Sequence, residues 1–190
     1  MNPIATLHMA NGRNIVIEHF AGVSAQYVNS FIYTASRGYL DHHAIERIVP
    51  GNWVDVSYTA FGKKECRYLI PNEFELNPDV VPLDSHPGAV CMGGYGEAGL
   101  AGCEFFFPLR DCPDHKGIYP VFGRVLEGMD ELYRLEKVET VPVTDFPIEG
   151  VEVNRPVKPE IIERVELELH GEIYPEPVRV REPELPECWK

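Results

Sequence analysis

The stretch that decides the fold is IERIVPGNWVDVS, residues Ile45–Ser57. It holds two short apolar runs on either side of Pro50–Gly51, a pair that is typical of a turn between strands. Side chains along a strand point alternately to its two faces, so Arg47 points to the face opposite Ile48. By the same alternation, one face of the second run carries Trp53, Asp55 and Ser57. The stretch therefore predicts an antiparallel hairpin.

Arg47 has two interpretations at this point. A cation in an apolar strand either pairs with an acid at the rim of the sheet or lines a wet pocket. Asp55 stands across the predicted hairpin and would be the partner in a rim pair. Taken alone, Arg47 favours the rim pair, and only residues further along the chain bring the pocket forward.

The composition is that of an ordinary globular chain: of 190 residues, 44% are hydrophobic and 25% are charged. This length suits one domain with a substantial core, or one domain with a tail. The formal net charge of −13 argues against nucleic acid or an anionic membrane as a partner, because binding phosphate needs a basic surface. We expect a monomer.

The five cysteines are odd in number and form no CxxC pair, so neither a disulfide framework nor a zinc ribbon is predicted. The first residues, MNPIATLHMANG, lack the basic and apolar regions of a signal peptide. No apolar run approaches the roughly 18 residues of a membrane span. We therefore expect a cytoplasmic protein that holds no metal and no cofactor.

Apolar periodicity divides the chain into short strands and two helices. The expected helices are Ala25–Arg37, with Ser24 as its N-cap, and Met129–Lys137. The expected strands are Ile4–Met9, Asn14–Phe20, Ala44–Val49, Trp53–Thr59, Gly88–Met92, Cys103–Leu109, Tyr119–Val125 and Glu160–Glu168. Many short antiparallel strands with hairpin signals predict an all-β fold: a closed eight-stranded antiparallel barrel whose ends are capped by the two α-helices.

The parts of the chain between and after these elements have their own signatures. Phe61–Pro87 and Thr140–Lys158 are rich in proline and are interpreted as a long surface excursion and a connection. Residues 1–169 are interpreted as the domain, and residues 170–190, with several prolines and many glutamates, as a tail. A solvated end is expected, with docking of Tyr174 and Trp189 on the barrel as the alternative.

Four stretches, in this order along the chain, carry a family resemblance: IERIVPG (Ile45–Gly51), GAVCMGG (Gly88–Gly94), GCEFFF (Gly102–Phe107) and PVFGRVLEGMDEL (Pro120–Leu132). Together they resemble the cyclophilins, the barrel-type peptidyl-prolyl cis-trans isomerases. The resemblance extends over roughly Ile4–Leu169. It implies a groove on the outer face of the barrel in which a proline-containing peptide or unfolded segment binds.

Carried over by position, the resemblance implies that Arg47 is the catalytic residue of an isomerase. The residues that it implies for substrate binding are Trp53, Asp55, Gly93, Gly94, Glu104, Phe106, His115 and Tyr119. Alternation along FFF separately places Phe106 on the face opposite Phe105 and Phe107, so two of these rings are expected in the core and one in the groove. No metal or cofactor is implied.

This sequence departs from the family pattern at the groove. Asn52 replaces an apolar residue, Gly94 replaces an asparagine, and Asp55 and Glu104 replace glutamines. A carboxylate only accepts hydrogen bonds, whereas an amide also donates them. Two hypotheses follow: a slow isomerase whose acidic groove prefers prolines flanked by Lys or Arg, or a non-catalytic module that binds proline-containing or basic segments on the same scaffold.

Overall fold

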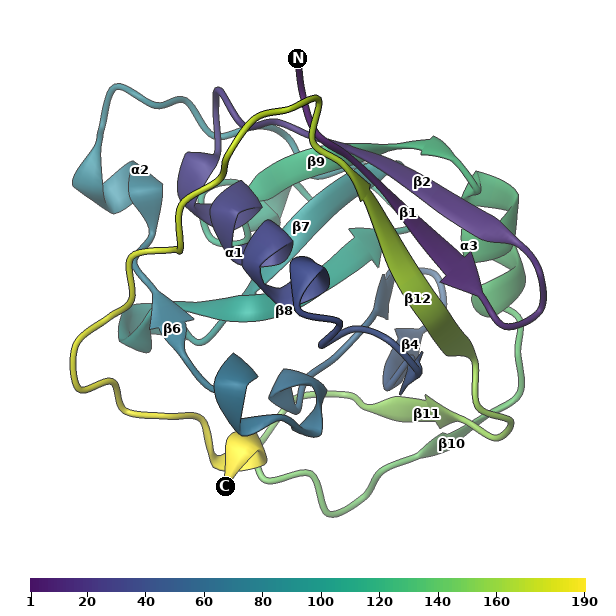
Figure 1. The fold of residues 1–190 in the computed structure, drawn as a ribbon. Coiled ribbons are helices and arrows are strands. Elements are labelled where there is room, and N and C mark those ends of the chain that lie inside the picture. The colour runs from purple at the N-terminus through teal and green to yellow at the C-terminus, as the bar shows by residue number, and fades with distance from the viewer.

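Antiparallel pairing organises the chain, which is described over residues 1–190 by a computed structural model (Figure 1). The order of hydrogen-bonded strands in the main, 10-stranded sheet is β3-β12-β1-β2-β9-β7-β8-β5-β4, and β6 pairs with β8. β10 and β11 form a separate two-stranded sheet. No helix is long and apolar enough to cross a bilayer.

The elements are short, and most lie where periodicity predicts them. The strands are β1 (Ile4–Met9), β2 (Asn14–His19), β3 (His43–Ala44), β4 (Arg47–Val49), β5 (Trp53–Asp55), β6 (Leu69–Ile70), β7 (Ala89–Gly94), β8 (Leu100–Pro108), β9 (Val121–Glu127), β10 (Thr140–Pro142), β11 (Asn154–Pro156) and β12 (Ile161–Glu168). The helices are α1 (Ala25–Ser36), α2 (Glu73–Leu76) and α3 (Met129–Leu135).

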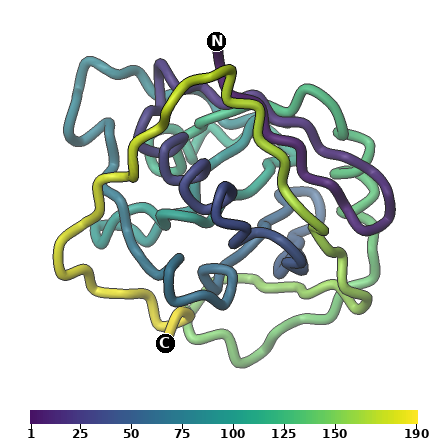
Figure 2. Tube along the Cα trace, viewed as in Figure 1, coloured from purple at the N-terminus to yellow at the C-terminus, as the bar shows by residue number.

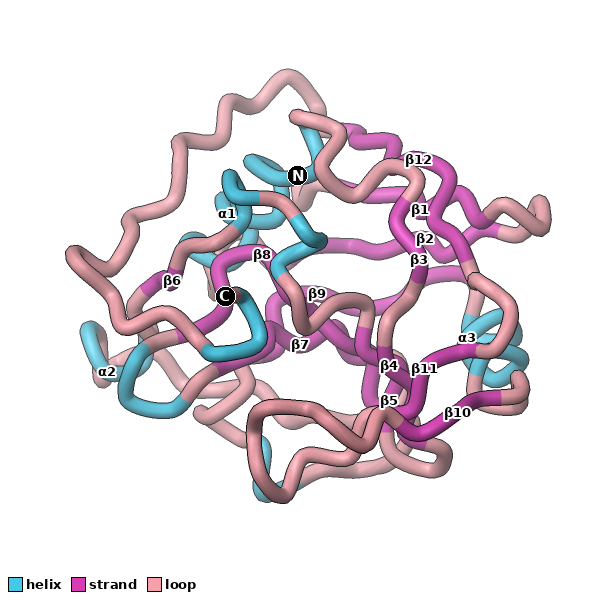
Figure 3. Tube along the Cα trace, turned by 90° about the horizontal axis from the view of Figure 1, so that it is seen from below, coloured by secondary structure: helices cyan, strands magenta, loops and turns pink.

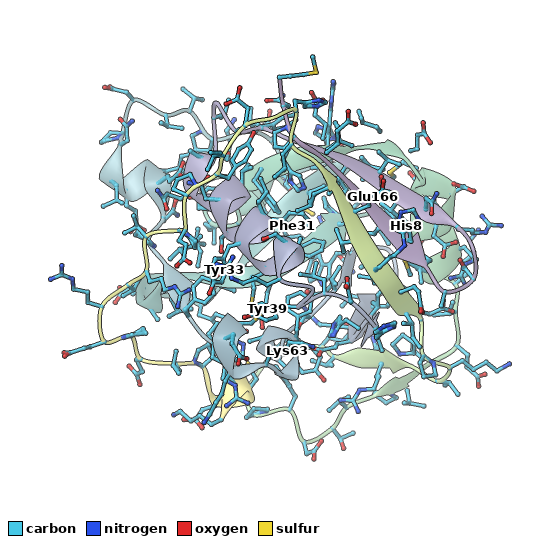
Figure 4. The ribbon with its side chains drawn as sticks, in the orientation of Figure 1. His8, Phe31, Tyr33, Tyr39, Lys63 and Glu166 are labelled. Atoms are coloured by element: carbon cyan, nitrogen blue, oxygen red, sulfur yellow. The ribbon has the colours of Figure 1, made fainter.

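The core lies between the inner face of the curled sheet and α1, which runs across the front of β7 and β8 in Figure 1. Phe31 of α1, labelled in Figure 4, packs edge to face on Phe105 of β8 with ring centroids 5.3 Å apart. On the outer side, His8 of β1 and Glu166 of β12 meet at 3.1 Å between Nε2 and Oε2. At β1 and β12 the sheet therefore has an apolar inner face and a polar outer face, as side-chain alternation requires.

The prediction of a closed barrel with two helices is wrong. The sheet is open, because the strand order ends at β3 and β4 and these two strands do not pair with each other. Ile45 and Glu46, which join them, serve different neighbours: the amide of Ile45 donates to Glu160 O, and that of Glu46 donates to Val56 O. The expected strand Ala44–Val49 is therefore split into β3 and β4. These two strands are joined by the chain itself, through Ile45 and Glu46, and not by inter-strand hydrogen bonds.

The third helix, α2, lies in the stretch that was interpreted as irregular. Asn72 caps it, because its Oδ1 accepts a hydrogen bond from Phe74 N at 3.2 Å. The sequence carries this signal, an N-cap asparagine followed by acidic residues. In contrast, the Ser24 hydroxyl does not cap α1 but donates to Val121 O, and the first turn of α1 is engaged instead by the Glu73 carboxylate, which accepts from Gln26 N.

The residues after β12 run back over the molecule (yellow in Figure 2) and end beside the two 3-10 turns that follow β5. Val180 N donates to Leu69 O, and the guanidinium of Arg179 lies 4.3 Å from the centroid of the Tyr68 ring. Trp189, only 2% exposed, belongs to the main core cluster. This segment is therefore docked on the sheet and does not hang free in solvent.

Candidate functional site

A cavity of about 680 Å³ opens on the outer face of the sheet where β4, β5, β7 and β8 lie next to each other. That volume suits a short peptide segment, since ligand pockets commonly span about 300–1,000 Å³. Its walls contain every site residue that the sequence predicted: Arg47, Trp53, Asp55, Gly93, Gly94, Glu104, Phe106, His115 and Tyr119. Residues from Arg47 to Tyr119, far apart along the chain, are thus brought to one place.

Strand alternation builds the floor of the cavity. Phe105 and Phe107 belong to the main core, whereas Phe106, 7% exposed, packs outside it against Ala89, Cys91 and Val121. The predicted division of the three rings is therefore confirmed. Asp55 of β5 stands opposite Phe106 of β8 in register, so the outward residues of both strands face the same cavity.

Aromatic rings enclose one end of the cavity. The rings of Trp53 and Phe106 have centroids 6.2 Å apart, and His115 lies 5.5 Å from Trp53 and 5.7 Å from Phe106. Tyr119 closes the group, 4.8 Å from His115. Burial lowers the pKa of His115, which keeps its ring neutral at pH 7. This end is an uncharged aromatic pocket of the kind that binds a small apolar ring.

Arg47 stands next to the aromatic pocket and is held on two sides. Its Nη1 donates to Asp55 Oδ2 at 3.1 Å, and its Nε donates to the carbonyl oxygen of Glu152 at 2.6 Å. Its guanidinium carbon lies 5.4 Å from the centroid of the Trp53 ring. No hydrogen bond within the chain engages Nη2, so that nitrogen is the donor left for a ligand. Both interpretations of Arg47 hold: it pairs with Asp55, and it lines the pocket.

Two of the acidic residues that line the cavity, Asp55 and Glu104, differ in the groups that contact their carboxylates. Burial raises the pKa of Asp55 to about 7, although the adjacent guanidinium of Arg47 opposes that rise. Glu104 is 3% exposed and has no cation beside it. Its Oε1 accepts from Ala60 N and Trp189 Nε1, and its Oε2 from Tyr95 Oη, each at 2.7 Å. Glu104 therefore ties three parts of the chain together, and its oxygens are taken.

Gly94 lies at the edge of the cavity where β7 ends. A Cβ at this position would lie 3.0 Å from Leu100 Cδ2, which is tighter than ordinary packing. The asparagine of the family pattern therefore has no room here unless Leu100 moves. The glycine lowers the polarity of the wall, and the neighbouring backbone is left closer to any bound peptide.

Stability should depend on pH through Glu104. Burial raises its pKa from the ordinary 4.5 to about 8, so between these values the folded state binds more protons than the unfolded state. The free energy of unfolding contributed by this group therefore falls as pH rises through that window. One pKa unit corresponds to about 1.4 kcal/mol. From pH 5 to pH 8, the free energy of unfolding of Glu104→Gln should therefore rise by roughly 2 kcal/mol or more relative to that of wild type.

Urea unfolding of both proteins at the two pH values measures this gain. Asp130→Asn, which removes an exposed carboxylate on α3, is the matched control and should show no relative change. Parallel pH dependence of wild type and Glu104→Gln would show that Glu104 is ionised throughout.

Sequence reasoning missed one wall of the cavity. Residues between β10 and β11 form it, and Figure 3 shows this segment as the loop beside β4 and β5. Its lining residues are Phe146, Ile148, Gly150, Val151 and Glu152. The stretch has no apolar period, so no local signal marks it. Tyr58 and Tyr95, which also line the cavity, carry no signal that distinguishes them from core aromatics.

These features define a class of proteins: antiparallel β-proteins with a peptide-sized groove on the outer face of a curled sheet. Comparison with known proteins identifies the family within that class. Residues 4–174 match the sequence family described as cyclophilin type peptidyl-prolyl cis-trans isomerase/CLD. The chain belongs to this family.

Individual relatives agree with that assignment. Peptidyl-prolyl cis-trans isomerase CYP18-2 of Arabidopsis thaliana is 32% identical over 158 residues, which cover 80% of this chain and 92% of that protein. Peptidylprolyl isomerase domain and WD repeat-containing protein 1 of Mus musculus is 28% identical over 152 residues, 78% of this chain. The match covers only 23% of that longer relative.

Solved structures show the same fold. A crystal structure of a cyclophilin type peptidyl-prolyl cis-trans isomerase of Cryptosporidium parvum superposes with a TM-score of 0.68 at 16% identity, over 88% of this chain and 98% of that one. A second crystal structure of that protein, in the presence of the dipeptide Ala-Pro, gives a TM-score of 0.66 at 17% identity, over 85% and 96% of the two chains. The fold is therefore cyclophilin-like.

Proposed function

We propose that this protein is a peptidyl-prolyl cis-trans isomerase in which Arg47 stabilises the twisted X–Pro amide while Phe106 and Trp53 hold the proline ring. The observation that carries the proposal is the position of one guanidinium beside an uncharged aromatic pocket in a single cavity. The crystal structure of a relative in the presence of Ala-Pro supports a proline-containing ligand.

The proposed chemistry needs no nucleophile. Rotation about a peptide bond has a barrier of about 18–20 kcal/mol because amide resonance is lost. In the twisted state the proline nitrogen regains a lone pair and accepts hydrogen bonds. A donor that reaches this nitrogen stabilises the twisted state over both planar isomers, which is the requirement for catalysis. Arg47 Nη2 is suited to the role, because arginine stays charged and has several donors.

We infer that the other predicted residues shape the groove around the peptide. His115 and Tyr119 complete the proline pocket, Gly93 and Gly94 leave room for the peptide backbone, and Asp55 orients Arg47. Glu104, whose oxygens are occupied, supports the wall from behind.

The proposed substrates are exposed proline-containing segments of unfolded proteins, so the proposed role is in protein folding, as a monomer. All five cysteines are free thiols, which suits the reducing cytoplasm that we propose as its compartment.

A non-catalytic binding module is the second candidate. It is favoured by the two hydrogen bonds that already engage Arg47, from Nη1 to Asp55 and from Nε to the Glu152 carbonyl. A guanidinium held in this way has less freedom to follow the proline nitrogen as the amide twists. In this case the protein would bind prolyl peptides without increasing the rate of isomerisation.

Exchange between the cis and trans forms of a short prolyl peptide, followed by NMR, tests the proposal. Uncatalysed exchange takes tens to hundreds of seconds, and a catalytic amount of the protein should shorten it measurably. Peptides with Lys near the proline, but not next to it, should exchange faster than neutral ones, since the net charge of −13 attracts them. That advantage should shrink at high salt, because ions screen exposed charges.

The same measurements separate the two candidates. Exchange at the uncatalysed rate, together with saturable binding of the peptide, would reject the isomerase and support the module. Equal rates for Lys-flanked and neutral peptides at low salt would reject the preference for basic flanks alone.

A further inference from the structure

The cavity continues beyond Arg47, away from the aromatic pocket, into a part that the proposed isomerase chemistry does not use. Tyr58, which follows β5, lines one side of this part. Phe146, Ile148 and Val151, from the segment between β10 and β11, line the other. Because both parts belong to one cavity, a peptide bound at the aromatic pocket would extend into this one.

The segment that forms the far wall is anchored at its base. β10 pairs with β11, and Val143 N donates to Val153 O at 2.8 Å. The Val153 side chain is buried, so the base of the loop is fixed to the body of the protein. A loop closed in this way presents its tip in a defined place.

The tip of the segment is held against the sheet at two more points. The Phe146 ring packs edge to face on Tyr58, with centroids 5.0 Å apart, and the Tyr58 hydroxyl accepts a hydrogen bond from Arg155 Nη2 at 3.0 Å. The Glu152 carbonyl accepts from Arg47 Nε at 2.6 Å. The wall is therefore positioned by the same arginine that is proposed to act on the proline.

The chemistry of this part of the cavity is apolar. Of the segment's acidic residues, Asp145 and Glu149 are exposed and do not line the cavity. Glu152 does line it, but this residue is also exposed and its Oε1 accepts a hydrogen bond from Asn154 Nδ2. Asp55 is already paired with Arg47. A charged side chain packed against the apolar side chains here would lose its hydration, whereas an apolar side chain would gain from leaving water.

We propose that Tyr58, Phe146, Ile148 and Val151 form a second, apolar subsite that binds the side chain next to the proline, so that the protein selects prolyl peptides with a large apolar or aromatic neighbour. The inference rests on the proposed function in one respect: the proline itself occupies the aromatic pocket beside Arg47. It adds to that function the class of sequence that is recognised.

Peptides that vary only in the residue before or after proline test the subsite. Calorimetry gives the Kd of versions carrying Ala, Leu, Phe, Lys or Glu at each position, and NMR exchange is recorded on the same peptides. Filling an apolar pocket discriminates by about 10-fold or more. We therefore expect Phe or Leu at one of the two positions to bind about tenfold more tightly than Ala.

Phe146→Ala should remove most of that preference and leave the Kd of the Ala-containing peptides unchanged. Phe146→Leu, which keeps an apolar side chain, should retain part of it. The matched control is Tyr133→Ala, which removes an exposed aromatic ring from α3 and should bind all peptides as wild type does. Thermal unfolding of each variant within a few degrees of wild type shows that the fold is kept.

The outcomes are distinct for the subsite and for the proposed function. Equal Kd values for Ala and Phe peptides at both positions, or an undiminished preference in Phe146→Ala, would overturn the subsite even if the protein catalyses exchange. A preference in Kd without faster exchange would support the subsite and reject the isomerase. If no peptide of the panel binds, both are rejected.

Discussion

Arg47→Ala is expected to lower kcat/KM for prolyl exchange by about 10²–10³, the effect of removing one preorganised donor from a reacting centre. The loss should fall on kcat, because the hydrogen bond to the proline nitrogen exists only while the amide is twisted. The Kd of the peptide should change far less, since the aromatic pocket of Trp53, Phe106, His115 and Tyr119 stays in place. NMR exchange and calorimetry on the same peptide measure both quantities.

Two further variants sharpen this test. Arg47→Lys keeps the charge but loses the planar fork that engages Asp55 and the Glu152 carbonyl together, so only part of the rate should return. Arg110→Ala removes an exposed arginine near the groove, where its Nε donates to Asn52 Oδ1, and should retain the full rate. A folded Arg47→Ala protein that catalyses exchange within twofold of wild type would remove Arg47 from the mechanism.

Trp189→Ala is expected to be the most destabilising of the substitutions considered, by about 3–5 kcal/mol, the usual cost of deleting a large buried aromatic side chain. Its ring is 2% exposed and packs edge to face on Tyr95, with centroids 5.4 Å apart. Its Nε1 also donates to Glu104, so the substitution removes a donor from a buried carboxylate. The midpoint and slope of urea unfolding measure the change.

The controls for Trp189 separate the ring from its N–H group and from the rest of the segment. Trp189→Phe keeps most of the buried ring and should lose about 1–3 kcal/mol, the cost of leaving a buried hydrogen-bond acceptor without its donor. Ile173→Ala, at a side chain that is 93% exposed, should leave stability unchanged. If Trp189→Ala unfolds at the same urea concentration as Ile173→Ala, the segment after β12 does not dock in solution as it does in the structure.

Local pattern was sufficient to predict much of the floor of the groove. The period of two in WVD and FFF placed Trp53, Asp55 and Phe106 on one face, and the structure brings them to one cavity. His115 and Tyr119 lie between the resembling motifs, and only the resemblance, carried over by position, assigned them to the groove. Their roles in binding remain predictions.

Long-range contacts were out of reach of the sequence. Glu152 reaches Arg47 from a stretch with no periodicity, through a carbonyl group that any residue would supply. Glu104 was assigned to the substrate, yet it holds Ala60, Tyr95 and Trp189, which are distant in sequence. The prediction of a closed barrel failed for a related reason. Hydrophobic alternation marks strands and their faces, but it does not show whether Ile45 and Glu46 pair with one edge of the sheet or connect its two edges.

Two contacts join distant parts of the chain: β1 pairs with β12, and Trp189 donates a hydrogen bond to Glu104. Both have a consequence for synthesis on the ribosome. The strand that covers the open edge of β1 is translated more than a hundred residues after β1, and the indole that completes the Glu104 anchor follows later still. At about 5–20 residues per second, β1 can pair with β2 early, but its other edge stays unpaired for many seconds until β12 is made. Shielding of this nascent edge by a chaperone would therefore determine the yield of a protein whose own proposed work is on other unfolded chains.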